Sequence, residues 1–590
     1  MTFLLNGENK CDEIRKRTGE ILVSNARLYY LCVQCIYYDA MRKISLSLLP
    51  CAVGLIMAVS CNESDGIPTA VFSDFSYQVS MPDGDEVASP DWTPLLPGCY
   101  PDPSIVRVDD DYYMVNSSFA FYPGVPIWHS TDLRNWERLG YVLDRPSQLS
   151  LPDSIRVSGG IYAPSISYNP HNETFYMITT LVDNGGNFYV TCKDPKKGEW
   201  SDPVWLPEVG GIDPSLFFDA DGKAYIVNND SPEGEALYDG HRTIRIHDFD
   251  WKTGRVTGES KVIVNGGVNI DEKPVWIEGP HLYYIGGKYF LMCAEGGTGP
   301  EHREVIFESA NPKGPFRPCR INPILTQRGL DPSRRYPVTC AGHADLVEDK
   351  DGRWWAVFLG VRPYSEDGHD IMGRETFIHR VGWKYGQPVI TTRDEVLEGR
   401  PQRERESRLW TADGLVDDAF FIRNPKSDFF STDADGTLTV EASPVRFSDK
   451  KSPSAIGRWV TENAFELSVT LDEFSPQSPE DIAGLMLFQD DDCYIVFGKA
   501  VNSYGDTVAR VDARSKNDRV IEFESPIDDP SQPLRLRIVA DGKGNYSFEY
   551  AEGDGDYRQL SQTVPASLLS TRTAGNFTGT AMGVYAVAAE

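Results

Sequence analysis

The sequence predicts an all-β protein, in which a five-bladed β-propeller over residues 93–399 is followed by a β-sandwich over residues 410–590. Two observations predict this fold: a motif that recurs five times in the first region, and alternating apolar and polar residues in the second. The composition agrees, because 28 Tyr, 27 Phe and 12 Trp accompany 51 Gly and 40 Pro among 590 residues. Aromatic residues favour strands, and Gly and Pro favour the turns between them.

The net charge excludes one broad class of function. The chain carries 57 Lys and Arg against 87 Asp and Glu, a formal charge of −30 at pH 7. Because an acidic surface repels a phosphate backbone, we expect no nucleic acid partner. With 41% hydrophobic and 24% charged residues, the chain falls among folded globular proteins rather than disordered ones.

Residues 1–60 are predicted to be an upstream segment followed by an export signal. From Met41, which we expect to be the true start, a basic pair precedes a mostly apolar stretch over 44–59 that is too short for a span of roughly 20 residues. The pattern is similar to a bacterial lipoprotein signal with Cys61 as the lipidated residue, and ordinary cleavage is the alternative. We expect an exported protein, periplasmic or at the cell surface, that meets the membrane only through a lipid anchor. The acidic stretch over 61–92 is predicted to be a flexible tether.

Six further cysteines follow Cys61 and show no paired spacing of the kind that binds zinc. Six in about 530 residues do not make a disulfide scaffold, so we expect most of them to be buried like small apolar residues. They are Cys99, Cys192, Cys293, Cys319, Cys340 and Cys493.

A repeated unit organises the first region. Its copies open at Asp102, Ala163, Asp213, Gly279 and His343, and in four of the five copies the opening residue is followed by Pro. Most copies then pass through a turn rich in Asp or Gly into an aromatic-rich strand, which is a strong hairpin signal. Start-to-start spacings of 61, 50, 66 and 64 residues suit a four-stranded sheet, and five such sheets around one axis form a propeller.

Rotation about a central axis brings equivalent positions of the five repeats to one channel. The opening residues include Asp102 and Asp213, and Glu278 lies one residue before the fourth repeat. An Asp before Pro often only begins a turn. Three carboxylates at matching places, with His343 in the fifth repeat, favour a shared pocket instead. Two facing carboxyl groups can serve as general acid and general base, as glycoside hydrolysis requires, and a third raises the pKa of the acid.

Seven short motifs occur in order along the first region: Tyr100-Pro101-Asp102-Pro103-Ser104, Ser158-Gly159-Gly160-Ile161-Tyr162-Ala163-Pro164, Ile212-Asp213-Pro214-Ser215-Leu216, Ile277-Glu278-Gly279-Pro280, Ala294-Glu295-Gly296-Gly297-Thr298, Gly342-His343-Ala344 and Gly373-Arg374-Glu375-Thr376. Together they resemble glycoside hydrolase family 43, in its branch of two-domain β-xylosidases and α-L-arabinofuranosidases. The resemblance implies that Asp102 is the general base, that Glu278 is the general acid and that Asp213 orients the acid and modulates its pKa, with inversion at the anomeric carbon.

The resemblance also implies a set of substrate-binding residues. Arg374 matches a sugar-contacting Arg, while Phe119 and Tyr162 fall where relatives line the sugar subsite, although several relatives carry Trp at the second position. His343 matches a central His that binds an ordered water or a calcium ion in some relatives. No cofactor is required, and the expected substrates are plant cell-wall oligosaccharides derived from xylan or arabinoxylan.

A charged segment over 400–409 is predicted to link the propeller to the second region. Alternation in 465–471, 534–539 and 546–550 predicts half-buried strands of a sandwich. The ending over 576–585 is similar to the last strands of the concanavalin-like domain that follows the propeller in these β-xylosidases. In that group the domain leans against the active-site face, which implies cleavage at chain ends; a purely stabilising module is the alternative.

The predicted function is that of an exo-acting, inverting glycoside hydrolase that releases xylose from the non-reducing ends of β-1,4-xylo-oligosaccharides. The main alternative is an α-L-arabinofuranosidase that removes arabinose side chains, or an enzyme with both activities. A non-catalytic sugar-binding lipoprotein is a remote alternative, because all three carboxylates are present. The retaining fructan hydrolases are a further alternative, but their Asn-Asp-Pro-Asn signature is absent.

Overall fold

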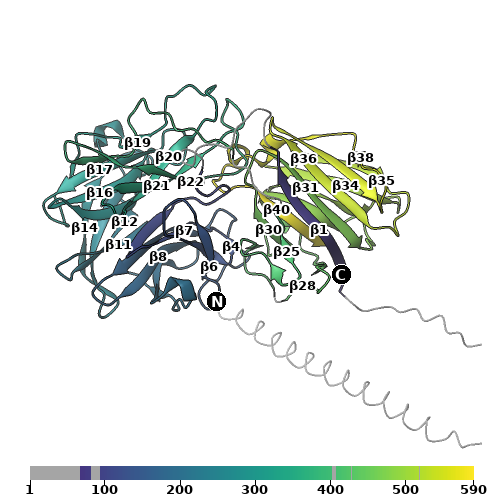
Figure 1. The fold of residues 1–590 in the computed structure, drawn as a ribbon, viewed down its shortest axis with the longest axis horizontal. Coiled ribbons are helices and arrows are strands. Elements are labelled where there is room, and N and C mark those ends of the chain that lie inside the picture. The colour runs from purple at the N-terminus through teal and green to yellow at the C-terminus, as the bar shows by residue number, and fades with distance from the viewer. Residues whose placement is uncertain (1–66, 81–93, 402–406, 427, 517–518, 590) are drawn as a thin grey trace, which may run out of the picture. The chain divides into compact units, whose positions relative to one another are not determined.

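A computed structural model of the protein describes residues 67–80, 94–401, 407–426, 428–516 and 519–589, and strands dominate it (Figure 1). The predicted signal segment and Cys61 lie outside these residues, so export and lipidation stay predictions. Among the described residues, no helix has the length and apolar character that a membrane crossing requires.

The propeller consists of five antiparallel sheets, one for each sequence repeat. The first three sheets comprise β2 (Ser104–Val108), β3 (Asp111–Val115), β5 (Gly124–Ser130) and β6 (Glu137–Leu143); β7 (Gly160–Asn169), β8 (Thr174–Val182), β9 (Gly186–Cys192) and β10 (Val204–Trp205); and β11 (Ile212–Phe218), β12 (Ala224–Asp230), β13 (Thr243–Asp250) and β14 (Arg255–Asn265). The fourth comprises β15 (Glu278–Ile285), β16 (Lys288–Glu295), β17 (Arg303–Ser309), β18 (Arg317–Pro318) and β19 (Leu325–Thr326), and the fifth comprises β20 (Thr339–Glu348), β21 (Trp354–Val361) and β22 (Glu375–Arg380).

The fifth sheet differs from the predicted four-stranded pattern, because it pairs only three strands among the described residues. The chain that follows it folds on itself, since β23 (Gly382–Lys384) and β24 (Gln387–Val389) form a separate hairpin. The two-residue turn between them, Tyr385-Gly386, has positive φ at both residues and favours this local hairpin, so the segment does not extend the fifth sheet.

The five sheets close into a ring around their first strands. Strands β2, β7, β11, β15 and β20 contact one another in this order, and β20 contacts β2 again. Asp345 on β20 reinforces the closure, because its Oδ2 accepts hydrogen bonds from the Ser104 hydroxyl at 2.7 Å and the Ile105 N–H at 2.9 Å. Its Oδ1 accepts a hydrogen bond from the Tyr283 hydroxyl of the fourth sheet at 2.6 Å.

All five repeats open on a residue in the left-handed region, with φ between 34° and 55°. In the second to fifth sheets, two residues of the first strand oppose one residue of its neighbour at this point. In the third sheet, Ile212 pairs with Asn229 and Ser215 with Val227, which leaves two residues opposite Asn228. Such a β-bulge bends the strand and changes the direction of its side chains. The shared irregularity therefore turns the opening residues of the repeats toward the channel.

Gly279 explains why the carboxylate of the fourth repeat is displaced by one residue. Its φ is +54°, and an added Cβ would stand 2.7 Å from Nε2 of His343. Only glycine fits beside that imidazole, so the fourth repeat carries its carboxyl group on Glu278 instead.

The second domain is a sandwich of two antiparallel sheets. One comprises β28 (Phe430–Thr432), β29 (Leu438–Glu441), β1 (Thr69–Val79), β31 (Ala464–Glu473), β36 (Leu534–Asp541), β37 (Asn545–Glu552), β38 (Arg558–Gln559) and β39 (Val564–Pro565). The other comprises β30 (Ala455–Trp459), β40 (Ala581–Val587), β32 (Ile482–Asp490), β33 (Cys493–Val501), β34 (Thr507–Ser515) and β35 (Arg519–Pro526). Short segments complete the fold: β4 (Phe121–Tyr122) pairs with β27 (Phe421–Ile422), and β25 (Trp410–Thr411) with β26 (Gly414–Leu415).

Strand β1 corrects the prediction of a flexible tether over 61–92. Residues Thr69–Val79 pair with β29 and β31 inside the sandwich, and Ala70, Phe72, Phe75 and Tyr77 are buried in its core. Apolar side chains alternate along this strand and point into the core, which stabilises the pairing. The prediction was wrong because it rested on the acidic residues that follow in the sequence. The remainder of the predicted tether lies outside the described residues.

The predicted linker over 400–409 also ends inside the sandwich. Ser407 exchanges two backbone hydrogen bonds with Tyr77 of β1, at 3.0 and 3.1 Å, and Leu409 is fully buried. Residues 402–406 lie outside the described part of the chain.

The six predicted buried cysteines are unpaired, and all except the half-buried Cys340 are buried. Burial raises the pKa of each thiol, for example to about 12 in Cys99 and Cys319.

Candidate active site

All seven residues predicted for catalysis and substrate binding line one pocket of about 420 Å³ at the propeller channel. They are Asp102, Asp213, Glu278, Phe119, Tyr162, His343 and Arg374. The three carboxylates come from the first, third and fourth sheets, and all three are at least nine-tenths buried. Such a convergence of buried acidic groups in a concave site is typical of a catalytic centre.

Asp102 is held in place by its neighbours in the first, second and fifth sheets. The Ser117 hydroxyl donates a hydrogen bond to Oδ2 at 2.6 Å and accepts one from the Ala163 N–H at 2.7 Å. The other oxygen, Oδ1, lies 3.5 Å from Nδ1 of His343 and 3.9 Å from a guanidinium nitrogen of Arg374. The carboxylate is therefore oriented by one short hydrogen bond and two nearby cationic or polar groups.

The backbone before Asp102 is also fixed by side chains. Nδ2 of Asn116 donates to the carbonyl oxygens of Tyr100 at 3.0 Å and Pro101 at 3.1 Å. The Thr376 hydroxyl donates to the Tyr100 carbonyl oxygen at 2.5 Å. Thr376 follows Arg374 by two residues, so one short motif serves both the Arg374 side of the pocket and the segment that leads into Asp102.

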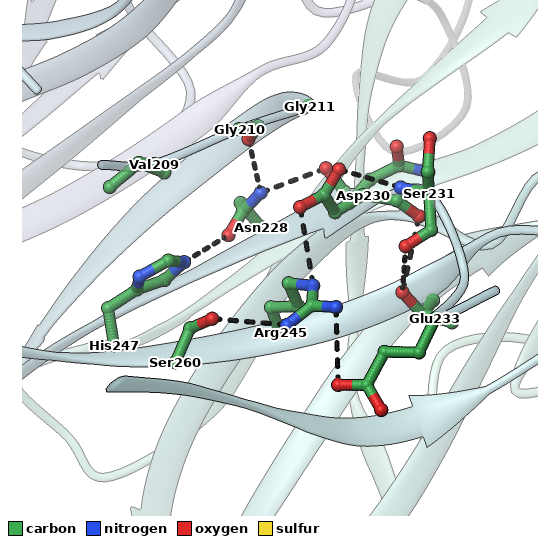
Figure 2. A network of polar contacts seen from close by, with 12 residues as sticks. Val209, Gly210, Gly211, Asn228, Asp230, Ser231, Glu233, Arg245, His247 and Ser260 are labelled. Carbon is green, nitrogen blue, oxygen red and sulfur yellow. Dashed lines mark hydrogen bonds and ion pairs between the residues drawn. The ribbon is translucent and has the colours of Figure 1, made fainter. Parts of the chain in front are cut away.

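Asp213 follows a loop that is fixed by a polar network in the third sheet, which Figure 2 shows. Asn228 donates to the Gly210 carbonyl oxygen at 2.6 Å and accepts a hydrogen bond from Nε2 of His247 at 3.1 Å. Burial lowers the pKa of His247 to about 4, so its ring is neutral. Gly211, with φ of +63°, leaves no room for a side chain, because a Cβ would stand 1.8 Å from a carbonyl oxygen of β12.

The environment of Glu278 favours its protonated form. Burial raises its pKa well above the usual value, and the negative charges of Asp213 and Asp102 raise it further, while Arg374 and Arg242 oppose the shift. Such a carboxyl group holds its proton at a pH where exposed carboxyl groups are ionised.

Asp213 is tied to Glu278 through the backbone. Its Oδ2 accepts a hydrogen bond from the Gly279 N–H at 3.1 Å, directly after Glu278 in sequence. Burial raises the pKa of Asp213 to about 6, against the positive influence of His343. Asp213 thus positions the peptide that follows Glu278. When Asp213 is ionised, its negative charge also raises the pKa of Glu278.

The sandwich supplies one wall of the pocket through Phe577. The guanidinium carbon of Arg374 lies 4.6 Å from the centre of the Phe577 ring, and the rings of Phe119 and Tyr162 lie 5.5 and 5.7 Å from it. Nε of Arg374 is buried and finds no hydrogen-bond partner in the described part of the chain. The cation is therefore held by stacking on Phe577 and by the nearby carboxylate of Asp102, and the side chain lines the pocket.

The described side chains around His343 do not by themselves supply the ligand set of a calcium ion. The described residues contain no group of three or more His, Cys, Asp or Glu side chains placed to hold a metal. Calcium requires six to eight oxygen ligands, whereas the groups beside His343 include the imidazole of His302. Nε2 of His302 and Oε1 of Glu304 are buried and lack hydrogen-bond partners in the regions the structure describes, which suits an ordered water.

Several pocket residues were not predicted from the sequence. The pocket is also lined by Arg156, Ile212, Val275, Trp276, Gly297, Thr298 and Phe577. Gly297 and Thr298 belong to a quoted motif, and Ile212 and Trp276 lie within two residues of a predicted carboxylate, so proximity to the motifs was an available signal. Phe577 lies in the stretch that resembles the last strands of the concanavalin-like domain, and its place in the pocket agrees with the expectation that this domain leans against the active-site face, although the residue itself was not predicted. The segment over 576–580 is a loop rather than the start of the last strand, which begins at Ala581.

Comparison with known families decides the identity of this pocket. Residues 92–388 match the model described as glycosyl hydrolases family 43, and residues 415–590 match the model described as the β-xylosidase C-terminal concanavalin A-like domain. The chain belongs to glycosyl hydrolase family 43. It is a glycosidase, and the predicted propeller and concanavalin-like domain are confirmed. Family 43 glycosidases act without a cofactor.

Similar proteins cover nearly the whole described chain. A xylosidase/arabinosidase of Butyrivibrio fibrisolvens is 37% identical over 511 residues, covering 84% of this chain and 95% of that protein. A non-reducing end α-L-arabinofuranosidase of Bacteroides ovatus is 35% identical over 510 residues, covering 84% of this chain and 90% of that protein. A crystal structure of a family 43 protein retrieved from a capybara gut metagenome superposes with a TM-score of 0.78 at 38% identity, covering 88% of this chain and 100% of that one.

Proposed function

We propose that this family 43 glycosidase is an exo-acting, inverting enzyme that releases xylose from the non-reducing ends of β-1,4-xylo-oligosaccharides. The observation that carries the proposal is the pocket itself, in which three buried carboxylates meet an unsatisfied arginine and a wall of aromatic rings. A volume of about 420 Å³ suits one or two sugar rings rather than a polymer passing through. Phe577, which narrows the pocket from the sandwich, supports action at a chain end.

In the proposed reaction, Asp102 is the general base and Glu278 the general acid. A water attacks the anomeric carbon and transfers a proton to Asp102, while the bond from that carbon to the leaving oxygen breaks on the opposite face. Glu278 gives its proton to the leaving oxygen, so the products are a free sugar with inverted anomeric configuration and a shortened oligosaccharide. Arg374 is proposed to hold sugar hydroxyls, and Asp213 to keep the acid protonated.

Arabinofuranosidase activity is the second candidate. The names of the two curated relatives favour it, since one is called a xylosidase/arabinosidase and the other an α-L-arabinofuranosidase. The pocket geometry is compatible with both sugars, because the carboxylates act on the anomeric carbon in either case.

The purified enzyme should be assayed on 4-nitrophenyl β-D-xylopyranoside and 4-nitrophenyl α-L-arabinofuranoside side by side, and on xylotetraose. We expect a higher kcat/KM for the xyloside, stepwise release of xylose, and α-xylose as the first product seen by proton NMR. A preference for the arabinofuranoside would establish the second candidate. First release of the β-anomer would contradict inversion, and rapid appearance of internal fragments from long xylan would contradict exo action.

The pH profile of kcat/KM tests the role of Asp213. Activity should fall as pH rises through the raised pKa of Glu278, because the ionised acid cannot protonate the leaving oxygen. In Asp213→Asn, which keeps an acceptor for the Gly279 N–H but removes the charge, this fall should move to lower pH. At neutral pH we expect kcat to drop on the order of 10- to 100-fold.

Asp512→Asn is the matched control for this experiment. Burial raises the pKa of Asp512 to about 6, as in Asp213, but Asp512 lies on β34 of the sandwich and does not line the pocket. Its pH profile should be that of the wild type. A profile of Asp213→Asn that coincides with wild type would contradict the proposed influence of Asp213 on the acid.

A further inference from the structure

Trp276 is an exposed tryptophan on the rim of the catalytic pocket. It lies two residues before Glu278, lines the pocket and is 37% exposed, and the preceding Val275 is 41% exposed. Exposure of this degree does not by itself set a tryptophan apart, because Trp383 is 42% exposed. What distinguishes Trp276 is that it lines the catalytic pocket beside the proposed acid.

The backbone of Trp276 is held in an unfavourable conformation. Its φ is +50°, in the left-handed region that large side chains rarely occupy. Hydrogen bonds to two neighbouring loops maintain it: the Trp276 N–H donates to the Gly240 carbonyl oxygen at 2.9 Å, and the Val275 carbonyl oxygen accepts from the N–H groups of Gly296 and Gly297 at 2.8 and 3.1 Å. Such strain at a pocket rim is typical of a position retained for function.

Arg242 fixes the tryptophan ring. Its guanidinium carbon lies 4.6 Å from the centre of the ring, and its Nε and one terminal nitrogen donate to Oδ1 of Asn229 at 3.0 and 2.7 Å. Asn229 in turn donates to the Ile277 carbonyl oxygen at 2.6 Å. One side-chain pair thus holds both the ring of Trp276 and the peptide that joins it to Glu278.

The support continues into the network of Figure 2. The second terminal nitrogen of Arg242 donates to the Ser231 hydroxyl at 2.9 Å, and the Ser231 N–H donates to Oδ1 of Asp230 at 2.7 Å. Oδ2 of Asp230 lies 3.3 Å from Nε of Arg245. Arg242 itself does not line the pocket. The surface that Trp276 offers to a ligand is therefore the part of the ring that Arg242 leaves uncovered, and the contact with Arg242 holds that ring in place.

We propose that Trp276 is the platform on which the sugar ring of the leaving group stacks. This rests on the proposed function, in which Glu278 protonates the oxygen of the leaving group. That oxygen must lie against Glu278, so the ring attached to it lies on the Glu278 side of the pocket, where Trp276 stands. The apolar face of a pyranose ring matches an aromatic surface, and a preformed platform binds it with little loss of conformational freedom.

The test compares two substrates in the full-length enzyme and its Trp276→Ala and Trp276→Phe variants. Xylotriose has a sugar as its leaving group, whereas β-D-xylosyl fluoride has a single atom that cannot stack. In Trp276→Ala we expect kcat/KM for xylotriose to fall roughly 10-fold, mostly through KM, while the value for the fluoride stays within about twofold. Trp276→Phe should recover most of the loss.

Trp383→Ala is the matched control, because Trp383 is a 42% exposed tryptophan on β23 that does not line the pocket. We expect this variant to keep the wild-type kcat/KM for both substrates. Equal losses on the two substrates in Trp276→Ala would overturn the proposal and assign Trp276 to support of Glu278. No loss on either substrate would overturn it as well. A wild-type enzyme inactive on both would instead refute the proposed function, which separates the two failures.

Discussion

Replacing Asp102 with Asn should reduce kcat on xylosides and xylo-oligosaccharides on the order of 10³- to 10⁴-fold. An asparagine can still accept the hydrogen bond of the Ser117 hydroxyl, so the side chain keeps its orientation. It cannot take a proton from the attacking water, and the reaction then depends on an unassisted nucleophile. The measurement is kcat and KM on xylotriose, with thermal unfolding followed by circular dichroism to establish that the variant folds.

Asp219→Asn is the matched control for this substitution. Asp219 is also a buried propeller carboxylate, held by the Tyr289 hydroxyl at 2.6 Å, but it lies outside the catalytic pocket. We expect its kcat to stay within about twofold of wild type, since it takes no part in the proton transfer. If Asp102→Asn kept a tenth or more of wild-type kcat, the general base would have to be another group.

Replacing Arg362 with Leu should destabilise the protein by about 3–5 kcal/mol. Arg362, which is 4% exposed, donates two hydrogen bonds to Glu375 of the propeller at 2.6 and 2.8 Å and two to Glu462 of the sandwich at 2.9 and 3.0 Å. It also donates to the Thr461 carbonyl oxygen at 2.9 Å. Without it, two carboxylates that are 0% and 4% exposed lose their buried counter-charge.

The loss should be visible both in stability and in activity. Urea unfolding followed by tryptophan fluorescence should show a lower midpoint. Because Glu375 follows Arg374 directly, and accepts a hydrogen bond from the Gly98 N–H at 3.0 Å, we also expect a lower kcat/KM in the folded variant. The two effects share one cause, because Arg362 connects the domain interface to β22, the strand that begins directly after Arg374 in the sequence.

Arg353→Leu is the comparison that isolates burial. Arg353 pairs with Asp351 at 3.1 Å, but the two side chains are 53% and 52% exposed. Solvent screens such a pair, so its removal should cost less than about 1 kcal/mol. Equal shifts of the unfolding midpoint in the two variants would contradict the view that the buried network stabilises the domain interface.

The sequence by itself determined the propeller and the residues that meet in its channel. Because the repeats are related by rotation, each first strand must turn its opening residue toward the same channel. Each repeat therefore opens on a left-handed residue, and the second to fifth sheets carry a bulge there. This shared geometry produces a recurring sequence pattern, from which Asp102, Asp213 and Glu278 could be predicted to lie together. The sandwich strands could also be predicted, because side chains in a strand alternate between its two faces with a period of two residues.

Only the tertiary structure decided the parts that have no repeating counterpart. Strand β1 finds its partners more than 350 residues away, where Phe72 pairs with Leu438 and Leu471. Phe577 reaches the pocket from the other domain, and Trp276 faces it through a strained turn held by Arg242. The raised pKa of Glu278 likewise depends on burial and on charges from other sheets. Each of these depends on packing between segments distant in sequence. Such packing produces no periodic pattern of residues from which it could be predicted.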